Sequence, residues 1–158
     1  ANDEEITLNV SQNQINVVGS VFSFTSKLIE GNYPDYEKVF PVGDESKLIV
    51  DKNEFNTALS RASVLSNEKY RGIRLSLNKD LLKIEANNPE KESAEEEIKV
   101  DYSGPELEIG FNISYLQESL TTIKDLSAEI VFFGQESSCI VKNKENEDLI
   151  HVIMPMRL

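Results

Sequence analysis

The sequence predicts an α+β domain built as a pseudo-twofold repeat, with two helices packed on antiparallel sheets. Two observations carry this prediction. A unit of one strand, one helix and three strands occurs twice after residue 47, and each unit contains one helix with a single apolar stripe. A few strands without a helix precede the first unit. The length of 158 residues fits one domain, or one domain and a fragment.

The first segment of the chain is predicted to contain only short strands. Apolar and polar residues alternate from Ile6 to Val10, and two further apolar runs at residues 15–18 and 21–26 follow across short turns. Three such strands indicate part of a domain, with a small independent sheet as the alternative. The loop at residues 30–36 contains Gly and Pro and is interpreted as a connector between domains.

The first repeat unit begins with a strand at residues 47–50 and a helix at residues 52–65. Asp51 and Glu54 fit a capping box at the start of this helix. Apolar residues at helical spacing form one stripe, as in an ordinary core helix. Three strands complete the unit, at residues 73–77, 81–86 and 95–102.

The second repeat unit has the same order of elements. A strand at residues 107–111 leads into a helix at residues 113–123, with Asn112 as its N-cap. Three strands follow, at residues 128–133, 138–143 and 149–154. The doubled β-α-β-β-β unit therefore predicts a pseudo-twofold α+β domain.

Composition restricts how this chain can meet its partners. Apolar residues make up 39% and charged residues 28%, which fits a folded domain, and the net charge is −12. A protein this acidic cannot grip DNA over its whole surface, since duplex binding neutralises phosphates with clustered Lys and Arg. No apolar run is long enough to span a bilayer, and the first residues do not resemble a secretory signal. The single cysteine, Cys139, is compatible with a reducing cytoplasm.

The residues that carry enzyme chemistry are sparse. His151 is the only histidine and lies in a predicted strand, and Cys139 fits a buried small hydrophobic residue. Glycine-rich phosphate loops are absent. The acidic run at residues 90–97 raises divalent-cation binding as a possibility, but metal catalysis needs carboxylates from separate elements. A contiguous run is more often a solvated contact surface. We expect no catalytic centre, metal or cofactor.

The segments that carry a family resemblance are residues 25–28, 33–36, 65–72, 86–90, 102–104 and 154–158. In order and over essentially the whole chain, they resemble the bacterial DNA polymerase III β sliding clamps. The resemblance implies a DNA-clamp fold and a non-catalytic processivity subunit of the bacterial replicative polymerase, located in the cytoplasm at the nucleoid. It also implies that residues 1–35 are the end of the family's middle domain and that residues 36–158 are its third domain. The family's first domain then has no counterpart in this chain.

The family's partners follow from the same resemblance. Its members form head-to-tail dimeric rings around double-stranded DNA and dock the polymerase, the clamp loader and repair polymerases through short linear motifs. Carried over position by position, the peptide-docking residues are Pro34, Lys38, Val39, Tyr70, Asn112, Tyr115, Ser138, Val152, Ile153, Met154, Pro155, Met156 and Arg157. Lys38 replaces a frequent Arg and Tyr70 a frequent Phe. From the spacing alone, residues 154–158 fit the end of a core strand better than a docking surface, and the resemblance reverses this preference.

Two further surfaces are implied by the resemblance. The dimer contact corresponds to Val64, Leu65, Glu90, Glu92 and Glu96, and the DNA-facing cations to Lys52, Arg61 and Lys124. Acidic side chains around an apolar centre would steer a basic first-domain surface. Sparse cations suit sliding along the backbone without base readout. A chain without the first domain is expected to be monomeric and to bind DNA poorly. The alternatives are an unrelated peptide-binding adaptor and a carboxylate-dependent nuclease.

Overall fold

The computed structural model describes residues 5–33, 35–67, 69–144 and 149–157. It divides into two compact units, Ala1–Asp35 and Tyr36–Leu158. The first unit is one antiparallel sheet in the order β1-β2-β3, formed by β1 (Thr7–Val10), β2 (Gln14–Val18) and β3 (Ser23–Lys27). The three predicted strands are therefore present. None of the described residues of this unit is fully buried, so its apolar side chains have no core of their own to enter.

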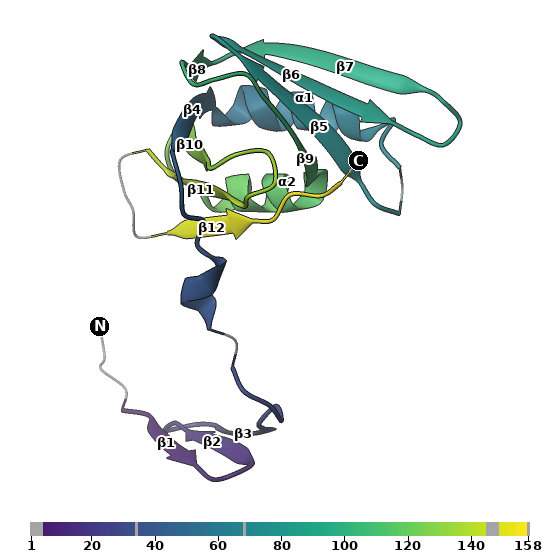
Figure 1. Ribbon diagram of the computed structural model, residues 1–158. Coiled ribbons are helices and arrows are strands. Elements are labelled where there is room, and N and C mark those ends of the chain that lie inside the picture. The colour runs from purple at the N-terminus through teal and green to yellow at the C-terminus, as the bar shows by residue number, and fades with distance from the viewer. Residues whose placement is uncertain (1–4, 34, 68, 145–148, 158) are drawn as a thin grey trace. The chain divides into compact units, whose positions relative to one another are not determined.

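The second unit contains two antiparallel sheets and two helices (Figure 1). The five-stranded sheet has the order β12-β11-β10-β4-β8, and the four-stranded sheet has the order β7-β6-β5-β9. The strands of the five-stranded sheet are β4 (Ser46–Asp51), β8 (Asp101–Tyr102), β10 (Ser127–Phe132), β11 (Cys139–Asn143) and β12 (Ile150–Ile153). Those of the four-stranded sheet are β5 (Gly72–Asn78), β6 (Leu81–Asn87), β7 (Ser93–Lys99) and β9 (Leu107–Asn112).

The predicted repeat is present, and the two copies exchange their first strands. β4 leaves its own copy and pairs with β10 of the second copy, while β9 pairs with β5 of the first. The registers are equivalent: Asp51 lies opposite Ser127, and Asn112 lies opposite Gly72. Each sheet therefore combines three consecutive strands of one copy with the first strand of the other, and the five-stranded sheet also contains the short strand β8.

Each helix begins directly after one of these exchanged strands. In α1 (Lys52–Ser63), the Asp51 carboxylate accepts hydrogen bonds from the backbone N–H groups of Asn53 and Glu54, both at 2.9 Å. In α2 (Ile113–Thr122), the Asn112 side chain accepts from the N–H of Ser114 at 2.9 Å. Both predicted N-caps are confirmed. None of the helices in the described ranges combines the length and apolar character needed to cross a membrane.

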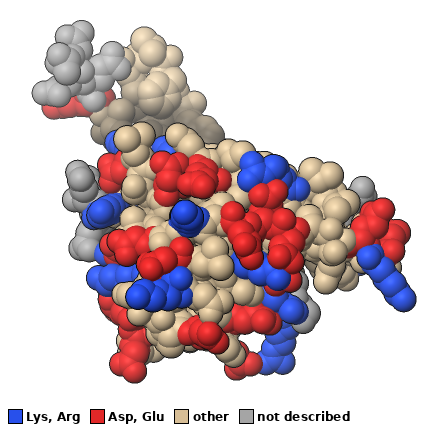
Figure 2. Space-filling view, turned by 90° about the horizontal axis from the view of Figure 1, so that it is seen from above, with Lys and Arg blue, Asp and Glu red and all other residues tan. Residues whose placement is uncertain are grey.

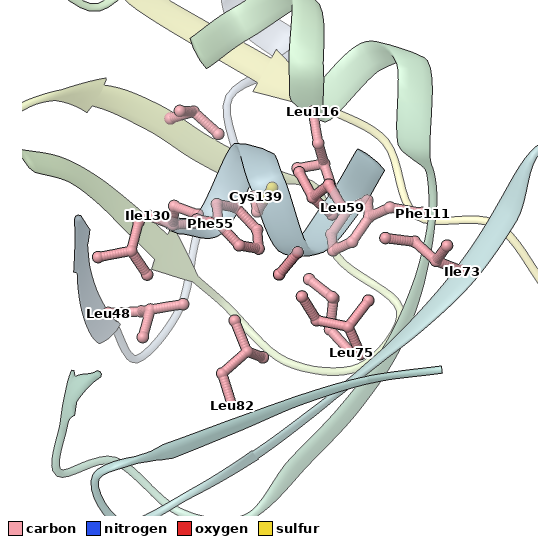
Figure 3. Close-up of a cluster of buried hydrophobic side chains, with 14 of the residues drawn as sticks. Leu48, Phe55, Leu59, Ile73, Leu75, Leu82, Phe111, Leu116, Ile130 and Cys139 are labelled. Carbon is pink, nitrogen blue, oxygen red and sulfur yellow. The ribbon is translucent and has the colours of Figure 1, made fainter. Parts of the chain in front are cut away.

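The core lies between the helices and the two sheets (Figure 3). Phe55 and Leu59 of α1 and Leu116 of α2 are completely or almost completely buried there, together with strand residues from both sheets. Cys139 is fully buried among them, as predicted for a small hydrophobic residue. The apolar stripes of both helices therefore face one shared core, which fixes how the two copies sit on each other.

One predicted strand is wrong. Residues 95–102 were expected as one strand, but the chain breaks at Val100, so that β7 and β8 belong to different sheets. The backbone N–H of Val100 donates to the carbonyl of Asp80 at 3.2 Å, at the turn between β5 and β6. Tyr102 is then fully buried, and its hydroxyl donates to the carbonyl of Pro105 at 2.6 Å. A Cβ at Gly104 would lie 2.6 Å from this hydroxyl, so the close approach requires glycine there.

Candidate functional site

The C-terminal segment leaves its strand before the conspicuous methionines. β12 ends at Ile153, and residues 154–157 lie outside any regular strand. The backbone N–H of Met156 donates to the carbonyl of Gly110 on β9 at 2.9 Å, so this segment runs from the five-stranded to the four-stranded sheet. Met154 is 70% exposed. The segment is therefore a surface feature, and it does not simply finish a core strand.

A cleft with a volume of about 410 Å³ lies beside this segment. It is lined by Asn67, Tyr70, Gly72, Asn87, Asn88, Pro89, Met156 and Arg157. Three of the expected docking residues, Tyr70, Met156 and Arg157, are thus brought together. The other five lining residues were not predicted. The turn at residues 87–89 contributed only to the family resemblance. Its clustered amides and its proline were the sequence feature that could have indicated these lining residues.

The loop that carries Tyr70 is fixed by its own side chains. The Asn67 carboxamide oxygen accepts hydrogen bonds from the backbone N–H groups of Lys69 and Tyr70, at 2.9 and 3.1 Å. This local turn is the usual reason for Asn in such a loop. The Nζ of Lys69 lies 5.2 Å from the centre of the Tyr70 ring, a cation–π contact. Tyr70 is more than half exposed, so one face of the loop is open to partners.

The same loop is bound to the start of α2. The Asn112 carboxamide donates to the carbonyl of Tyr70 at 3.2 Å, while its oxygen caps the helix. The N–H of Ile113 donates to the carbonyl of Arg71 at 2.9 Å, and the Arg71 guanidinium donates to the Ser114 hydroxyl at 3.1 Å. Arg71 has a positive φ of 46°, unusual for a non-glycine residue. Asn112 is therefore engaged in positioning Tyr70.

The remaining expected docking residues are more dispersed. Tyr115 is exposed on α2, while Lys38 and Val39 are exposed in the 3₁₀ helix Tyr36–Val39. Ser138, Val152 and Pro155 are half-buried, and Ile153 is buried in the core, where it does not line a surface. Pro34 and Leu158 lie outside the described residues. Glu136 was not expected near this site, yet its carboxylate lies 3.9 Å from the Arg157 guanidinium.

The residues expected at a dimer contact lie around a second cleft. Val64, 78% exposed, and Glu90 both line this cleft, which has a volume of about 490 Å³. Leu65 is half-buried next to them. Glu92 belongs to the adjacent turn, where its carboxylate accepts from the Asn88 carboxamide at 2.8 Å. The structure thus places an exposed valine beside acidic side chains, and their role in a dimer contact stays a prediction from the resemblance.

Glu96 differs from the other acidic residues because it is paired within the domain. Its carboxylate accepts from Arg61 Nε at 2.8 Å and from Arg61 Nη2 at 2.6 Å, a two-bonded ion pair between β7 and α1. These hydrogen bonds hold the pKa of Glu96 below its usual value and raise the pKa of Arg61. The structure thus joins a residue expected at the dimer contact to one expected to face DNA.

The acidic run does not gather its carboxylates at one point. Glu95 and Glu96 are neighbours in β7 and point to opposite faces of the sheet. Glu95 pairs with Lys83 at 2.9 Å, and this hydrogen bond raises the pKa of Lys83. On the face over β5, β6 and β7, acidic and basic side chains are interspersed (Figure 2). Within the part of the chain that the structure describes, no three His, Cys, Asp or Glu side chains form a group that could hold a metal ion.

The other expected DNA-facing cations differ in their availability. The Lys52 Nζ donates to the carbonyl of Ile123 at 2.9 Å and thereby satisfies a group at the end of α2. Lys124, directly after that helix, is exposed. The lone histidine, His151, shares a hydrogen bond of 2.6 Å with the Thr122 hydroxyl, where neither residue has a catalytic partner among the described contacts. These contacts are structural.

The twofold α+β architecture, with two helices on antiparallel sheets, defines a clamp-type domain. Residues 37–157 match the family model described as DNA polymerase III beta subunit, C-terminal domain. The chain belongs to this family. The expected resemblance and the DNA-clamp fold are thereby confirmed.

Individual relatives agree with the family match. The chain is 47% identical to the beta sliding clamp of Pseudomonas aeruginosa over 99% of this chain and 42% of that protein, and 40% identical to that of Escherichia coli K12 over 99% and 43%. A crystal structure of the DNA polymerase III subunit beta from P. aeruginosa superposes with a TM-score of 0.92 at 46% identity, covering 100% of this chain and 44% of that one. The Caulobacter crescentus pol III beta structure gives a TM-score of 0.89 at 32% identity, covering 97% and 41%. The chain therefore spans less than half the length of these relatives.

Proposed function

We propose that this chain serves as the C-terminal part of a bacterial sliding clamp. In this role it is a non-catalytic subunit of DNA polymerase III that keeps the polymerase on its template and docks other proteins, in the cytoplasm at the nucleoid. The observation that supports the proposal best is the exposed C-terminal segment, whose Met156 and Arg157 line a cleft with Tyr70. Family membership leaves the unrelated adaptor without support.

The docking face has the chemistry of a site for short linear motifs of polymerases, the clamp loader and repair polymerases. Met154 and Met156 offer flexible apolar surfaces that adapt to varied side chains. Tyr70 and Tyr115 are both more than half exposed and present aromatic walls with polar tips. Arg157 supplies charge-assisted hydrogen bonds to a peptide's polar groups. Lys38 lacks the planar fork of Arg and makes less directional contacts.

We propose that Val64, Leu65 and Glu90 belong to a contact between subunits of a ring. An exposed apolar centre with acidic neighbours fits a basic, partly apolar partner surface. The Glu96 carboxylate is less available for this contact, because both of its oxygens already accept hydrogen bonds from Arg61. The chain alone is expected to sediment as a monomer. A tight symmetric dimer at micromolar concentration would contradict this assignment.

DNA contact in this proposal is weak and non-specific. The net charge of −12 opposes duplex binding, and of the three expected cations only Lys124 is exposed without a described side-chain bond. Enclosure of double-stranded DNA by a closed ring would supply the retention that local affinity does not. The chain alone is therefore expected to bind duplex DNA poorly. A salt-sensitive nanomolar complex would argue against this account.

We further propose that residues 1–35 correspond to the end of the family's middle domain and residues 36–158 to its third domain. Two observations support this division. The family model begins at residue 37, whereas the relatives align over 97–100% of the chain. In addition, the first unit has no buried residue of its own among those described, which is unusual for an independent domain.

Fluorescence polarisation tests the docking function. A short labelled peptide containing Gln, Leu and Phe should bind the full chain, and the Met154→Ala/Met156→Ala variant should weaken binding by about tenfold or more, as expected for anchor residues. Leu126→Ala is the matched control, because Leu126 is an equally exposed apolar residue elsewhere on the domain. Equal affinities for the wild type and the methionine variant would refute the proposed docking face.

A further inference from the structure

We propose that the cleft beside Tyr70 receives an acidic segment of a partner protein, adjoining the linear motif on the docking face. This inference rests on the proposed docking function and extends it to a second subsite. The cleft is continuous with the docking face because Met156 and Arg157 belong to both. A peptide bound along the C-terminal segment can therefore continue into the cleft from one of its ends.

The size of the cleft suits a short stretch of extended peptide. Its volume of about 410 Å³ is within the range of ligand sites in proteins, roughly 300–1,000 Å³. The lining combines the Tyr70 ring, the Pro89 ring and the Met156 thioether with three asparagine carboxamides. Apolar walls with a few polar groups favour side-chain contact together with hydrogen bonding to the peptide.

Charge decides which segment fits. The chain carries a net charge of −12, yet no carboxylate of the described residues lines this cleft, whereas the Arg157 guanidinium does. A second cation, Lys69, lies against the Tyr70 ring at 5.2 Å from its centre. The cleft is therefore a locally cationic site on an acidic protein. An acidic side chain is repelled by most of this surface but attracted here.

The hydrogen-bond donors of the cleft are available for such a side chain. Among the described residues, no hydrogen bond involves the Asn87 side chain, which is exposed at the end of β6. The Asn67 carboxamide uses its oxygen within the loop, and no described hydrogen bond involves its NH₂ group. Asn88 is different, because Glu92 occupies both ends of its carboxamide. Arg157 and two NH₂ groups therefore remain to donate to a carboxylate.

The described acid that competes for Arg157 is weakly held. Glu136 lies 3.9 Å from the Arg157 guanidinium, and both side chains are almost fully exposed, at 87% and 96%. An ion pair this long and this exposed contributes little. An incoming carboxylate that also binds Asn87 makes more hydrogen bonds than Glu136 does, so it can displace Glu136 from Arg157.

Peptides that differ only in charge test the inference. The labelled Gln-, Leu- and Phe-containing peptide is extended by two Asp, two Ser or two Lys residues, at either end, and titrated with the full chain at low salt. At one end, the Asp extension should lower Kd about threefold to tenfold relative to Ser, with loss of this gain at high salt. The protein's overall charge favours the Lys extension instead, so tighter binding of Asp reports the local site.

Two variants test whether the tighter binding of the Asp extension arises in this cleft. Asn87→Asp replaces a donor with a negative charge and should abolish the advantage of the Asp extension over the Ser extension, when both peptides are measured on this same variant. Asn78→Asp is the matched control, an exposed residue at the end of β5, on the turn to β6 that lies far along the strands from Asn87; it should keep the full advantage. The inference is overturned if neither Asp extension binds more tightly than Ser, or if the gain survives in Asn87→Asp. Failure of the unextended peptide to bind would refute the docking function and this subsite with it.

Discussion

Arg61 in the last turn of α1 and Glu96 in the edge strand β7 form a two-bonded ion pair, with N–O distances of 2.8 and 2.6 Å. The pair joins a helix to the strand at the border of the four-stranded sheet. Arg61 is 53% exposed and Glu96 24% exposed at their side chains, so the pair is partly shielded from water on the side of the acid. A substitution of either residue consequently affects two surfaces.

The ion pair predicts a pH dependence of stability. The pKa of Glu96 is lower in the folded state than its usual 4.5, so the pair stabilises the fold above that pH. This contribution is lost as the pH falls through the lowered pKa. Arg61→Gln should therefore reduce the urea midpoint at pH 7 and change it less at acidic pH. Glu96→Gln and the double variant should show the same flattened profile; additive losses in the double variant would contradict a shared interaction.

The N-cap of α1 predicts a second change in stability. Asp51→Ala removes the acceptor for two backbone N–H groups and should lower the free energy of unfolding by about 1 kcal/mol. Asp51→Asn keeps a capping oxygen without the charge and is the matched control. Chemical denaturation of the three proteins checks this. If Asp51→Asn loses as much stability as Asp51→Ala, the effect comes from the charge and not from capping.

The shared core predicts a large difference between two apolar residues of similar sequence position. Leu59 is fully buried, and Leu59→Ala should cost about 2–5 kcal/mol. Val64 is 78% exposed, and Val64→Ala should change stability by less than about 0.5 kcal/mol. Thermal unfolding measures both. A large loss in Val64→Ala would mean that this side chain serves the fold and is not reserved for a partner.

The buried thiol predicts chemical protection. Burial raises the pKa of Cys139 to about 12, so at pH 8 only about one thiol in ten thousand is ionised. A thiol-specific reagent should react with the native chain only through its unfolded fraction, and with the urea-unfolded chain at once. Leu59→Ala should accelerate the labelling of Cys139 in the native chain, because its lower stability raises the unfolded fraction. Rapid labelling of the native wild type would show that the strand β11 opens locally.

Much of the local structure could be predicted from the sequence because its causes are local. Apolar spacing placed both helices, and the side-chain chemistry of Asp51 and Asn112 placed their starts. The strand at residues 95–102 was wrong because its division depends on Asp80, which lies 20 residues earlier and binds Val100 through its backbone carbonyl. A backbone contact of this kind leaves no mark in side-chain alternation.

The site was predictable only where a residue's identity carried the signal. Tyr70, Met156 and Arg157, which the resemblance had named, line one cleft, and their role in docking stays a prediction. Asn87 and Asn88 were missed because their position follows from the pairing of β6 with β5, which returns the end of β6 to the start of β5. Arg61 and Glu96 are 35 residues apart, and no pattern in the sequence links them. The hydrogen bond from Lys52 to the Ile123 carbonyl could not be predicted for the same reason.

The exchange of first strands makes the two halves of the repeat depend on each other for folding. Neither half of the repeat can complete a sheet alone, because β4 and β9 each fill a place in the other half. Two polypeptides divided in the loop between β8 and β9 would therefore be obligate partners, each unfolded until it meets the other.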